Sequence, residues 1–534
     1  MGRQTNIDSI LALENRIQET ATELIQLKRS RNSLLDVARI PPEILGYIFH
    51  LKITPAVGFR FPSLHKGSYN FLLVCHHWFE VAHHTPELWS FWGNNVRDWK
   101  RRHLRSGTSP LDLVLSGARR QVEPFDGALR DALRDRAAHD TIRTIHLRSP
   151  EKDLLAAIVS ALTPKDEGVR HSSVESIALG DVDVSDFFAR YRFPKLRDLD
   201  LSGRFRISSW DCLTSSPMAL VSLSLHSDGT ASPKPALSTS QVLSLLALNP
   251  NIRYLVLDSL SITDDGRDIS TVRVILRHLE RLILGGEPHH VLAILRQLEL
   301  PEKLDDAKVT FKGCTLEEVR EAVGPYIRDY LHRDPRFKDR LGLFLSSTTD
   351  CISLEVDVIS DGYRDSNRLP QHDPPYTKFT ATLSEDASPD VRDELCGGIL
   401  ALLPQDRVVC FETNLLNPKD VLAAMTNIEV LHLIDAVVLR GFLLPEPDGP
   451  NTLEKLLPSL RRLYLEDPEV EDEDWGPLIV YLAHQTSDNQ DVSLAVFGEG
   501  VHICSGLVEQ VDELVKNFDY QPDPDEHCPF DVCP

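Results

Sequence analysis

The sequence lacks the features that mark several large classes of protein. No apolar run approaches the ~20 residues that a membrane-spanning helix requires, and the first residues do not read as a secretory signal peptide. The 57 Lys and Arg residues are outnumbered by 80 Asp and Glu residues, which leaves a formal net charge of −23. A nucleic-acid surface needs clustered positive charge, so we expect no binding to nucleic acid. Without a long apolar run or a signal peptide, we expect a protein of the cytoplasm or nucleus that does not bind membranes.

Cysteine is sparse and follows no metal-binding pattern. The nine cysteines are scattered among apolar neighbours, and their odd number indicates reduced thiols in a reducing compartment. No C-x2-C pair occurs. The densest group of metal-ligand residue types is C-terminal and lacks the paired spacing of a zinc site: His502, Cys504, His527, Cys528 and Cys533. We predict no metal site.

Motifs of catalysis are also missing. There is no G-x-S-x-G elbow, P-loop or Rossmann glycine pattern. Cys75 could be proposed as a nucleophilic thiol, but its setting between Val74 and a tryptophan-rich helix predicts burial, which makes a thiol a poor nucleophile. We therefore predict no enzymatic activity and no cofactor. A hydrolase or transferase with an unrecognised site stays open as an alternative.

Residues 1–37 form the first predicted segment, in which residues 7–35 read as an amphipathic helix. Its apolar residues recur three and four positions apart, as in a coiled coil, with Thr20 and Arg31 as interruptions. They are Ile10, Leu13, Ile17, Leu24, Leu27 and Leu34. Two interpretations remain open: a helix for dimerisation or docking, and a helix packed against its own protein.

Residues 38–98 predict three short helices. Pro41 and Pro42 precede an apolar-periodic run, where the fixed φ of proline suits a first helical turn. A second, more buried helix is expected over residues 72–79. Thr85 as N-cap and Pro86 at the first helical position predict a third. Such a small core is marginal alone and needs support from neighbouring chain or a partner.

Three motifs stand in order within this segment. They are Ile40-Pro41-Pro42-Glu43-Ile44-Leu45, then Leu73-Val74-Cys75 followed by Trp78, then Thr85-Pro86-Glu87-Leu88-Trp89. Together they resemble the F-box, and specifically the F-box-like proteins that are numerous in fungi. The chain departs from the family in opening with Ile-Pro instead of Leu-Pro, and in placing His76 and His77 after the central cysteine, where a basic residue is usual.

The resemblance implies a partner. An F-box docks on a Skp-type adaptor, and through it on a cullin. The residues that the resemblance implies for adaptor contact are Ile40, Pro41, Pro42, Ile44, Leu45, Ile48, Leu73, Val74, Trp78, Leu88 and Trp89. Some of them must instead hold the three helices together, and both roles stay open for each residue.

A repeat runs through residues 110–518. Short segments ending in Leu-x-Leu or Ile-x-Leu recur at steps of about 22 to 32 residues, the range of leucine-rich repeats. They are 142–147, 174–179, 196–201, 220–225, 252–257, 279–284, 428–433 and 460–465. Helical patterns fill several gaps, at 153–162, 240–248 and 289–298. One strand and one helix per step is the unit of an α/β solenoid.

The repeat is irregular. The resemblance to leucine-rich repeats is good for residues 139–290 and 425–467 and is interpolated between them, where 341–345, 352–358, 378–383 and 408–413 are strand-like. The asparagine that normally follows the strand is missing, with Arg204 and Leu260 in its place. Further strand (491–498) and helix (505–518) patterns precede an acidic tail at 519–534, and residues 360–376 read as an exposed loop.

The residues between the leucines are expected to line the opposite, concave face of the strands. They are Thr144, His146, Asp198, Asp200, Arg253, Tyr254, Val256, Arg281 and Ile283. We interpret them as a recognition surface, although each one could simply be solvated.

The fold class that follows is α/β: N-terminal helices, with a coiled-coil-like helix and a three-helix F-box-like segment, and then an irregular leucine-rich-repeat-like solenoid. The expected function is that of the substrate receptor of a Skp-cullin-F-box-type ubiquitin ligase, with an unknown protein substrate. The alternative is a leucine-rich-repeat scaffold that recruits no ligase.

Overall fold

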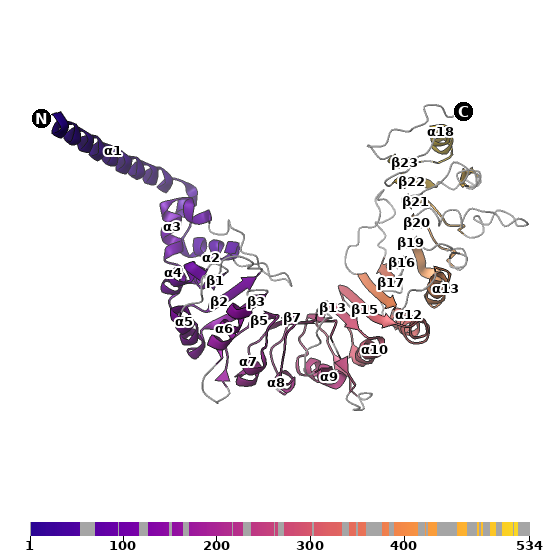
Figure 1. Ribbon diagram of the computed structural model, residues 1–534. Helices are drawn as coiled ribbons and strands as arrows, with labels where there is room; N and C mark the ends of the chain where they lie inside the picture. The colour runs from indigo at the N-terminus through magenta and orange to yellow at the C-terminus, as the bar shows by residue number, and fades with distance from the viewer. Residues whose placement is uncertain are drawn as a thin grey trace, which may run out of the picture. The chain divides into compact units, whose positions relative to one another are not determined.

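The structure of the chain is a computed structural model (Figure 1). It describes residues 2–53, 70–93, 96–116, 127–148, 152–163, 170–215, 217–227, 236–260, 262–264, 272–301, 304–333, 341–348, 351–358, 376–383, 389–414, 422, 425–434, 457–466, 478–479, 482–483, 492–497, 505–515 and 517–521. The chain divides into two compact units. Unit 1 is Met1–Leu220 with Pro233–Pro235, and unit 2 is Val221–Ser232 with Ala236–Pro534.

Unit 1 begins with helices, as predicted. They are α1 (Gly2–Ser33), η1 (Asp36–Arg39), α2 (Pro42–Ile53), η2 (Asn70–Leu73), α3 (His76–His83) and η3 (Pro86–Trp89). The prediction of a single helix over 72–79 is wrong, because Cys75 adopts an extended backbone (φ −160°) that separates η2 from α3. Thr85 does occupy the predicted N-cap position of η3, with Pro86 next to it, but its side chain makes no capping bond: the hydroxyl donates 2.7 Å back to the carbonyl of Val81.

Strands and helices alternate through the rest of unit 1. They are β1 (Phe91–Trp92), α4 (Val96–Ser106), β2 (Leu111–Ser116), α5 (Gly127–Ala138), β3 (Ile142–Arg148), α6 (Lys152–Leu162), β4 (Arg170–His171), β5 (Ser176–Gly180), α7 (Ser185–Arg190), β6 (Tyr191–Arg192), β7 (Asp198–Ser202) and α8 (Asp211–Thr214). β1, β2, β3, β5 and β7 pair in that order, all parallel. β1 was not predicted, and it places the first strand inside residues 38–98, which were expected to form helices.

Unit 2 continues the alternation. Its first elements are β8 (Ser222–His226), β9 (Leu237–Ser238), α9 (Thr239–Leu248), β10 (Tyr254–Asp258), β11 (Ile262–Thr263), β12 (Val274–Ile275), β13 (Arg281–Gly286), α10 (Pro288–Gln297), β14 (Leu298–Glu299), β15 (Asp306–Cys314), α11 (Leu316–Glu318), η4 (Val319–Val323) and α12 (Gly324–Arg333). The later ones are β16 (Leu341–Thr348), β17 (Cys351–Val358), β18 (Tyr376–Leu383), α13 (Pro389–Leu400), η7 (Gln405–Arg407), β19 (Val408–Thr413), β20 (Val430–Ile434), β21 (Arg462–Glu466), β22 (Ser493–Phe497), α18 (Ser505–Leu514) and β23 (Asn517–Gln521).

Every segment predicted from the Leu-x-Leu repeat contains a strand, and the three predicted gap helices exist as α6, α9 and α10. In each unit the helices that alternate with the strands, such as α5 to α8 in unit 1 and α9 to α13 in unit 2, lie along one face of the strands (Figure 1). The prediction of an α/β fold with N-terminal helices is therefore confirmed. The predicted C-terminal helix ends earlier than expected, at Leu514, and the strand β23 takes up residues 519–521, which were expected in the acidic tail. The remainder of that tail and the loop predicted from residue 360 to 375 lie outside the described residues.

In-register pairing places leucine beside leucine. Leu223 on β8 pairs with Leu255 on β10, and Leu255 pairs with Leu282 on β13. All three are buried. Because side chains alternate across a strand, this register puts one apolar row on the helical side of the strands and leaves the intervening polar residues on the other side.

One part of unit 2 breaks the parallel order. β15 pairs not with β16 but with β18, in parallel. β17 then pairs antiparallel with both β18 and β16, and β16 pairs in parallel with β19. The chain therefore enters this region at β16, which is separated from β15 by two strands, returns towards β15 through β17 and β18, and crosses back to β19. This inserted meander explains why residues 300–425 show strands without a period.

Aspartate is found in the turn after β5, where a leucine-rich repeat would normally have asparagine. Asp181 adopts a left-handed backbone (φ 56°) after β5, and its carboxylate accepts a 2.9 Å hydrogen bond from the backbone N–H of Arg204 in the next turn. Asp140 has a similar conformation (φ 53°) in the turn that precedes β3, and its carboxylate accepts a 2.6 Å bond from the N–H of Ser173. A short acceptor in a left-handed position replaces the expected amide. No described helix is both long and apolar enough to cross a bilayer.

Leu255→Ala tests the leucine row. Removing a fully buried side chain leaves a cavity and is expected to lower the free energy of unfolding by about 2–5 kcal/mol. Val256→Ala, on the other face of the same strand, should cost clearly less because Val256 is only half-buried. Equal losses in chemical denaturation would contradict the assignment of the two faces.

Candidate functional site

The helix α2 carries an exposed apolar stripe. Ile44, Tyr47, Ile48 and Leu51 recur at i, i+3, i+4 and i+7, so they share one face. Their exposed fractions lie between 43% and 61%. This face of α2 is a solvent-exposed apolar surface, and such surfaces often bind protein partners.

The opposite face of α2 is packed into a small core. Leu45 and Phe49 are buried, and Phe49 stacks on Phe71 of η2 with ring centroids 4.3 Å apart. Gly46 lets the helix approach Thr85, because a Cβ at residue 46 would lie 3.2 Å from the Thr85 hydroxyl. The described residues that complete this core are Ile53, Val81, Ala82, Leu88 and Trp89. With this face held, the stripe is presented on a fixed helix.

Two further apolar side chains are exposed beside this core. Leu73 ends η2 and Val74 follows it, with 85% and 55% of their surfaces exposed. Because Cys75 is extended and separates η2 from α3, Leu73 and Val74 do not belong to the face of a continuous helix. Cys75 itself is half-buried, less enclosed than its apolar neighbours predicted.

The structure sorts the eleven residues predicted for partner contact into three groups. Leu45, Leu88 and Trp89 are core residues, and the Trp89 indole N–H donates 2.8 Å to the carbonyl of Ala82. Ile40 and Trp78 are half-buried against that core. The remaining six are exposed: Pro41, Pro42, Ile44, Ile48, Leu73 and Val74. Sequence reasoning missed Tyr47 and Leu51, although their spacing from Ile44 and Ile48 was visible.

A cleft of about 720 Å³ lies next to the stripe. It is lined by parts of α2, α3 and η3 and by Pro110 and Arg143 from the strand region of unit 1. Glu43, Glu80 and Glu87 make its wall acidic. Arg143 faces it but is tied to Asp112, whose hydrogen bond raises the pKa of the guanidinium despite partial burial. Most of the lining surface is nevertheless apolar, so the cleft suits a side chain with an apolar stem and a basic or polar end.

The cleft does not hold a paired nucleophile and base among its lining residues. Its one serine, Ser90, donates 2.7 Å to the carbonyl of Glu87. His84 lies 2.8 Å from the carbonyl of Glu80 through Nδ1 and 3.8 Å from the Glu80 carboxylate. His76 approaches the same carboxylate at 3.5 Å. These histidines and Glu80 form a local ion-pair group along α3 and not an acid–base pair aimed at a substrate.

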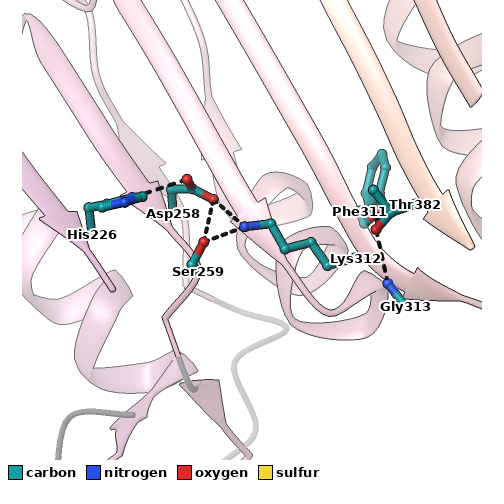
Figure 2. A network of polar contacts seen from close by, with 7 residues as sticks. All are labelled: His226, Asp258, Ser259, Phe311, Lys312, Gly313 and Thr382. Atoms are coloured by element: carbon teal, nitrogen blue, oxygen red, sulfur yellow. Dashed lines mark hydrogen bonds and ion pairs between the residues drawn. The ribbon is translucent and has the colours of Figure 1, made fainter. Parts of the chain in front are cut away.

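A second polar group lies on the strands of unit 2, on the face opposite the leucines (Figure 2). His226 Nδ1 lies 3.1 Å from the Asp258 carboxylate, and Lys312 Nζ lies 2.9 Å from its other oxygen. Ser259, in a left-handed turn (φ 57°), contacts both Asp258 and Lys312. Burial would raise the pKa of Asp258, but the hydrogen bond and charge of Lys312, with the charge of His226, outweigh burial and lower it.

Gly285 makes that group possible. It lies on β13, between β10 and β15, and a Cβ there would be 2.1 Å from Oδ1 of Asp258. The Asp258 side chain therefore crosses the glycine to reach Lys312 two strands away. Near the end of β15 the pairing with β18 becomes irregular, and there the N–H of Gly313 donates 3.2 Å to the hydroxyl of Thr382 (Figure 2).

Other charged groups occupy the same face further along. Lys378 on β18 pairs with Glu355 on β17. His432 on β20 is buried, with Nδ1 2.9 Å from Glu412 and Nε2 3.0 Å from Glu466. Of the predicted recognition residues, Arg253 is exposed, and those that follow are half-buried: Thr144, His146, Asp198, Asp200, Tyr254, Val256, Arg281 and Ile283. In each unit the face without the leucines is therefore chemically mixed, as protein-binding surfaces are.

Groups with metal or thiol chemistry are few among the described residues. Glu287, His289 and His290 bring one carboxylate and two imidazoles within 4.8 Å of one another, and could hold a divalent cation. They stand at the start of α10, whose dipole opposes a cation. Burial raises the pKa of Cys212 to about 11 and that of Cys314 to about 12, so neither is a ready nucleophile. The five C-terminal His and Cys residues considered for zinc lie outside the described residues.

Comparisons with known proteins give no family assignment: no protein-family model matches the chain, and no curated protein matches it.

Gly285→Ala tests the crossing of Asp258 over β13. The added methyl group would collide with the Asp258 carboxylate, and we expect a loss of about 1–3 kcal/mol in the free energy of unfolding. Gly398→Ala is the matched control, since Gly398 lies in α13 with nothing within 4 Å of an added Cβ. Alanine there should be neutral or stabilising by about 0.5–1 kcal/mol. A neutral Gly285→Ala would contradict the described contact.

Asp258 also predicts a pH dependence. Its folded-state pKa is lowered, so its contribution to stability is present above the unfolded-state pKa near 4 and is lost as the pH falls through the lower folded value. Asp258→Asn should therefore flatten the dependence of unfolding free energy on pH below about 4. The exposed Asp305 provides the control variant, Asp305→Asn. Unchanged acid sensitivity in Asp258→Asn would sink this account.

Proposed function

We propose that the chain is a substrate receptor of a Skp-cullin-F-box-type ubiquitin ligase. One observation carries the proposal: the helix that begins in the motif Ile40-Pro41-Pro42-Glu43-Ile44-Leu45 keeps an apolar stripe in water while its other face is packed. An F-box must do both, because it has to hold its own small core and still offer a surface to the adaptor.

The order of the motifs supports the same proposal. The central motif supplies the exposed Leu73 and Val74, and the last motif supplies Leu88 and Trp89 to the core. The partner is a Skp-type adaptor and, through it, a cullin. The acidic cleft beside α2 would accept a basic side chain of the adaptor at the edge of the contact.

For the rest of the chain we infer a leucine-rich-repeat-like solenoid that holds the substrate. Successive parallel strands, leucines aligned in register and helices on one face support this inference. The substrate would lie on the face without the leucines, where the Asp258 group, the Lys378–Glu355 pair and Arg281 present charges of both signs. The substrate itself is an unknown protein.

The chemistry would belong to the recruited ubiquitin-conjugating enzyme. By holding a substrate and the ligase in one complex, the receptor raises their effective concentration, and this chain needs no catalytic residue of its own. That division of labour agrees with the ion-paired cleft and the two thiols whose pKa is raised by burial.

Ile44→Asp tests adaptor binding. Placing a charge in the centre of a desolvated contact is expected to weaken binding of the purified Skp-type adaptor by about 30-fold or more. Leu104→Asp is the control, because Leu104 is an exposed leucine on α4 and belongs to none of the three motifs. Leu45 is unsuitable, since it is a core residue and its replacement would unfold the segment.

Binding would be measured by calorimetry, with circular dichroism to confirm that both variants fold. If the unaltered chain binds no Skp-type adaptor, the receptor proposal fails and the scaffold without ligase recruitment takes its place. If Ile44→Asp and Leu104→Asp bind equally well, the stripe is not the adaptor surface.

A further inference from the structure

The first helix has an apolar seam that no described residue covers. α1 extends over 32 residues, roughly 48 Å at about 1.5 Å per residue. Every side chain from Ser9 to Arg31 is exposed. The apolar residues of the seam have exposed fractions between 51% and 75%: Ile10, Leu13, Ile17, Leu24, Leu27 and Leu34.

The pattern on α1 specifies what can cover it. A seam of residues alternately three and four apart follows the repeat of 3.5 residues that lets two helices wind around each other, whereas a helix packed on a globular surface needs a wider apolar face. The hydroxyls of Thr20 and Thr22 donate to carbonyls four residues back, so these contacts stay within α1 itself. The seam is thus narrow, long and free for a second helix of the same kind.

We propose that α1 pairs with α1 of a second copy of this chain in a two-stranded, antiparallel coiled coil. The two polar residues of the seam decide the direction. Antiparallel pairing sets Thr20 against the partner's Leu24 and Arg31 against the partner's Leu13. Parallel pairing would set each of them against its own copy, so that two Arg31 guanidinium groups would meet inside the seam.

The flanking charges do not decide the direction. On one side of the antiparallel seam Glu14 meets the partner's Lys28, an attraction that the symmetry repeats, and on the other side Glu23 meets its own copy. Parallel pairing would bring Glu23 beside the partner's Lys28 twice, so the direction rests on Thr20 and Arg31 inside the seam. The F-box-like segment follows α1 in the chain, so the antiparallel coil would place two receptors at opposite ends of one assembly.

The mass of the full-length chain in solution, measured by light scattering during size exclusion, tests the pairing. We expect a dimer for the unaltered chain and a monomer for Leu24→Glu with Leu27→Glu, which puts charges in the seam. Thr22→Glu with Gln26→Glu adds the same charge to the outer face and should stay dimeric. A monomeric unaltered chain overturns the proposal, and so does a dimer that survives the seam variant. Adaptor binding, measured separately, is independent of this result.

Disulfide trapping tests the direction. α1 contains no cysteine, so Ile17→Cys protein can be mixed with Leu27→Cys protein under mild oxidation and the cross-linked peptides identified by mass spectrometry. An antiparallel coil yields the mixed 17–27 cross-link. Cross-links between two copies of Ile17→Cys would overturn the antiparallel arrangement.

Discussion

The rest of the structure depends on parallel strands that pair in register, so that leucine lies beside leucine from one strand to the next. The row through Leu223, Leu255 and Leu282 is buried on the helical side, and a slip by one residue would carry it to the opposite face. That constraint also decides where polar chemistry can lie. The charged group around Asp258 exists because every second residue is excluded from the leucine row.

Two kinds of surface result from one chain. In the helical segment the core takes one face of α2 and leaves the other apolar, because the segment is too small to bury both. In the strand region the non-leucine face is wide and its charges are already paired, as Lys312 is with Asp258 and Lys378 with Glu355. The first surface suits an apolar partner held tightly, and the second suits a partner selected by charge pattern.

Local patterns predicted local structure well. Each Leu-x-Leu segment contains a strand, and α6, α9 and α10 follow the helical gaps. The strand β1 was not predicted, because its two residues, Phe91 and Trp92, are too few to show a period. The order of β16, β17 and β18 was not predictable either, because it depends on contacts between residues far apart in the sequence. The core role of Leu45 and the exposure of Ile44 were equally invisible, since both residues are apolar and adjacent. The Asp258–Lys312 contact joins residues 54 positions apart, so no local spacing signals it.

The inserted meander in unit 2 has a consequence for synthesis on the ribosome. The edge of β15 is completed by β18 and not by the next strand to emerge, so its backbone groups must wait, unpaired, while the residues up to Leu383 are added. β16 must likewise wait for β19. Assembly in this region therefore cannot proceed one strand at a time from the N-terminus. The edge of β15 is open to misassociation until Leu383 has been added, and the edge of β16 until Thr413 has been added.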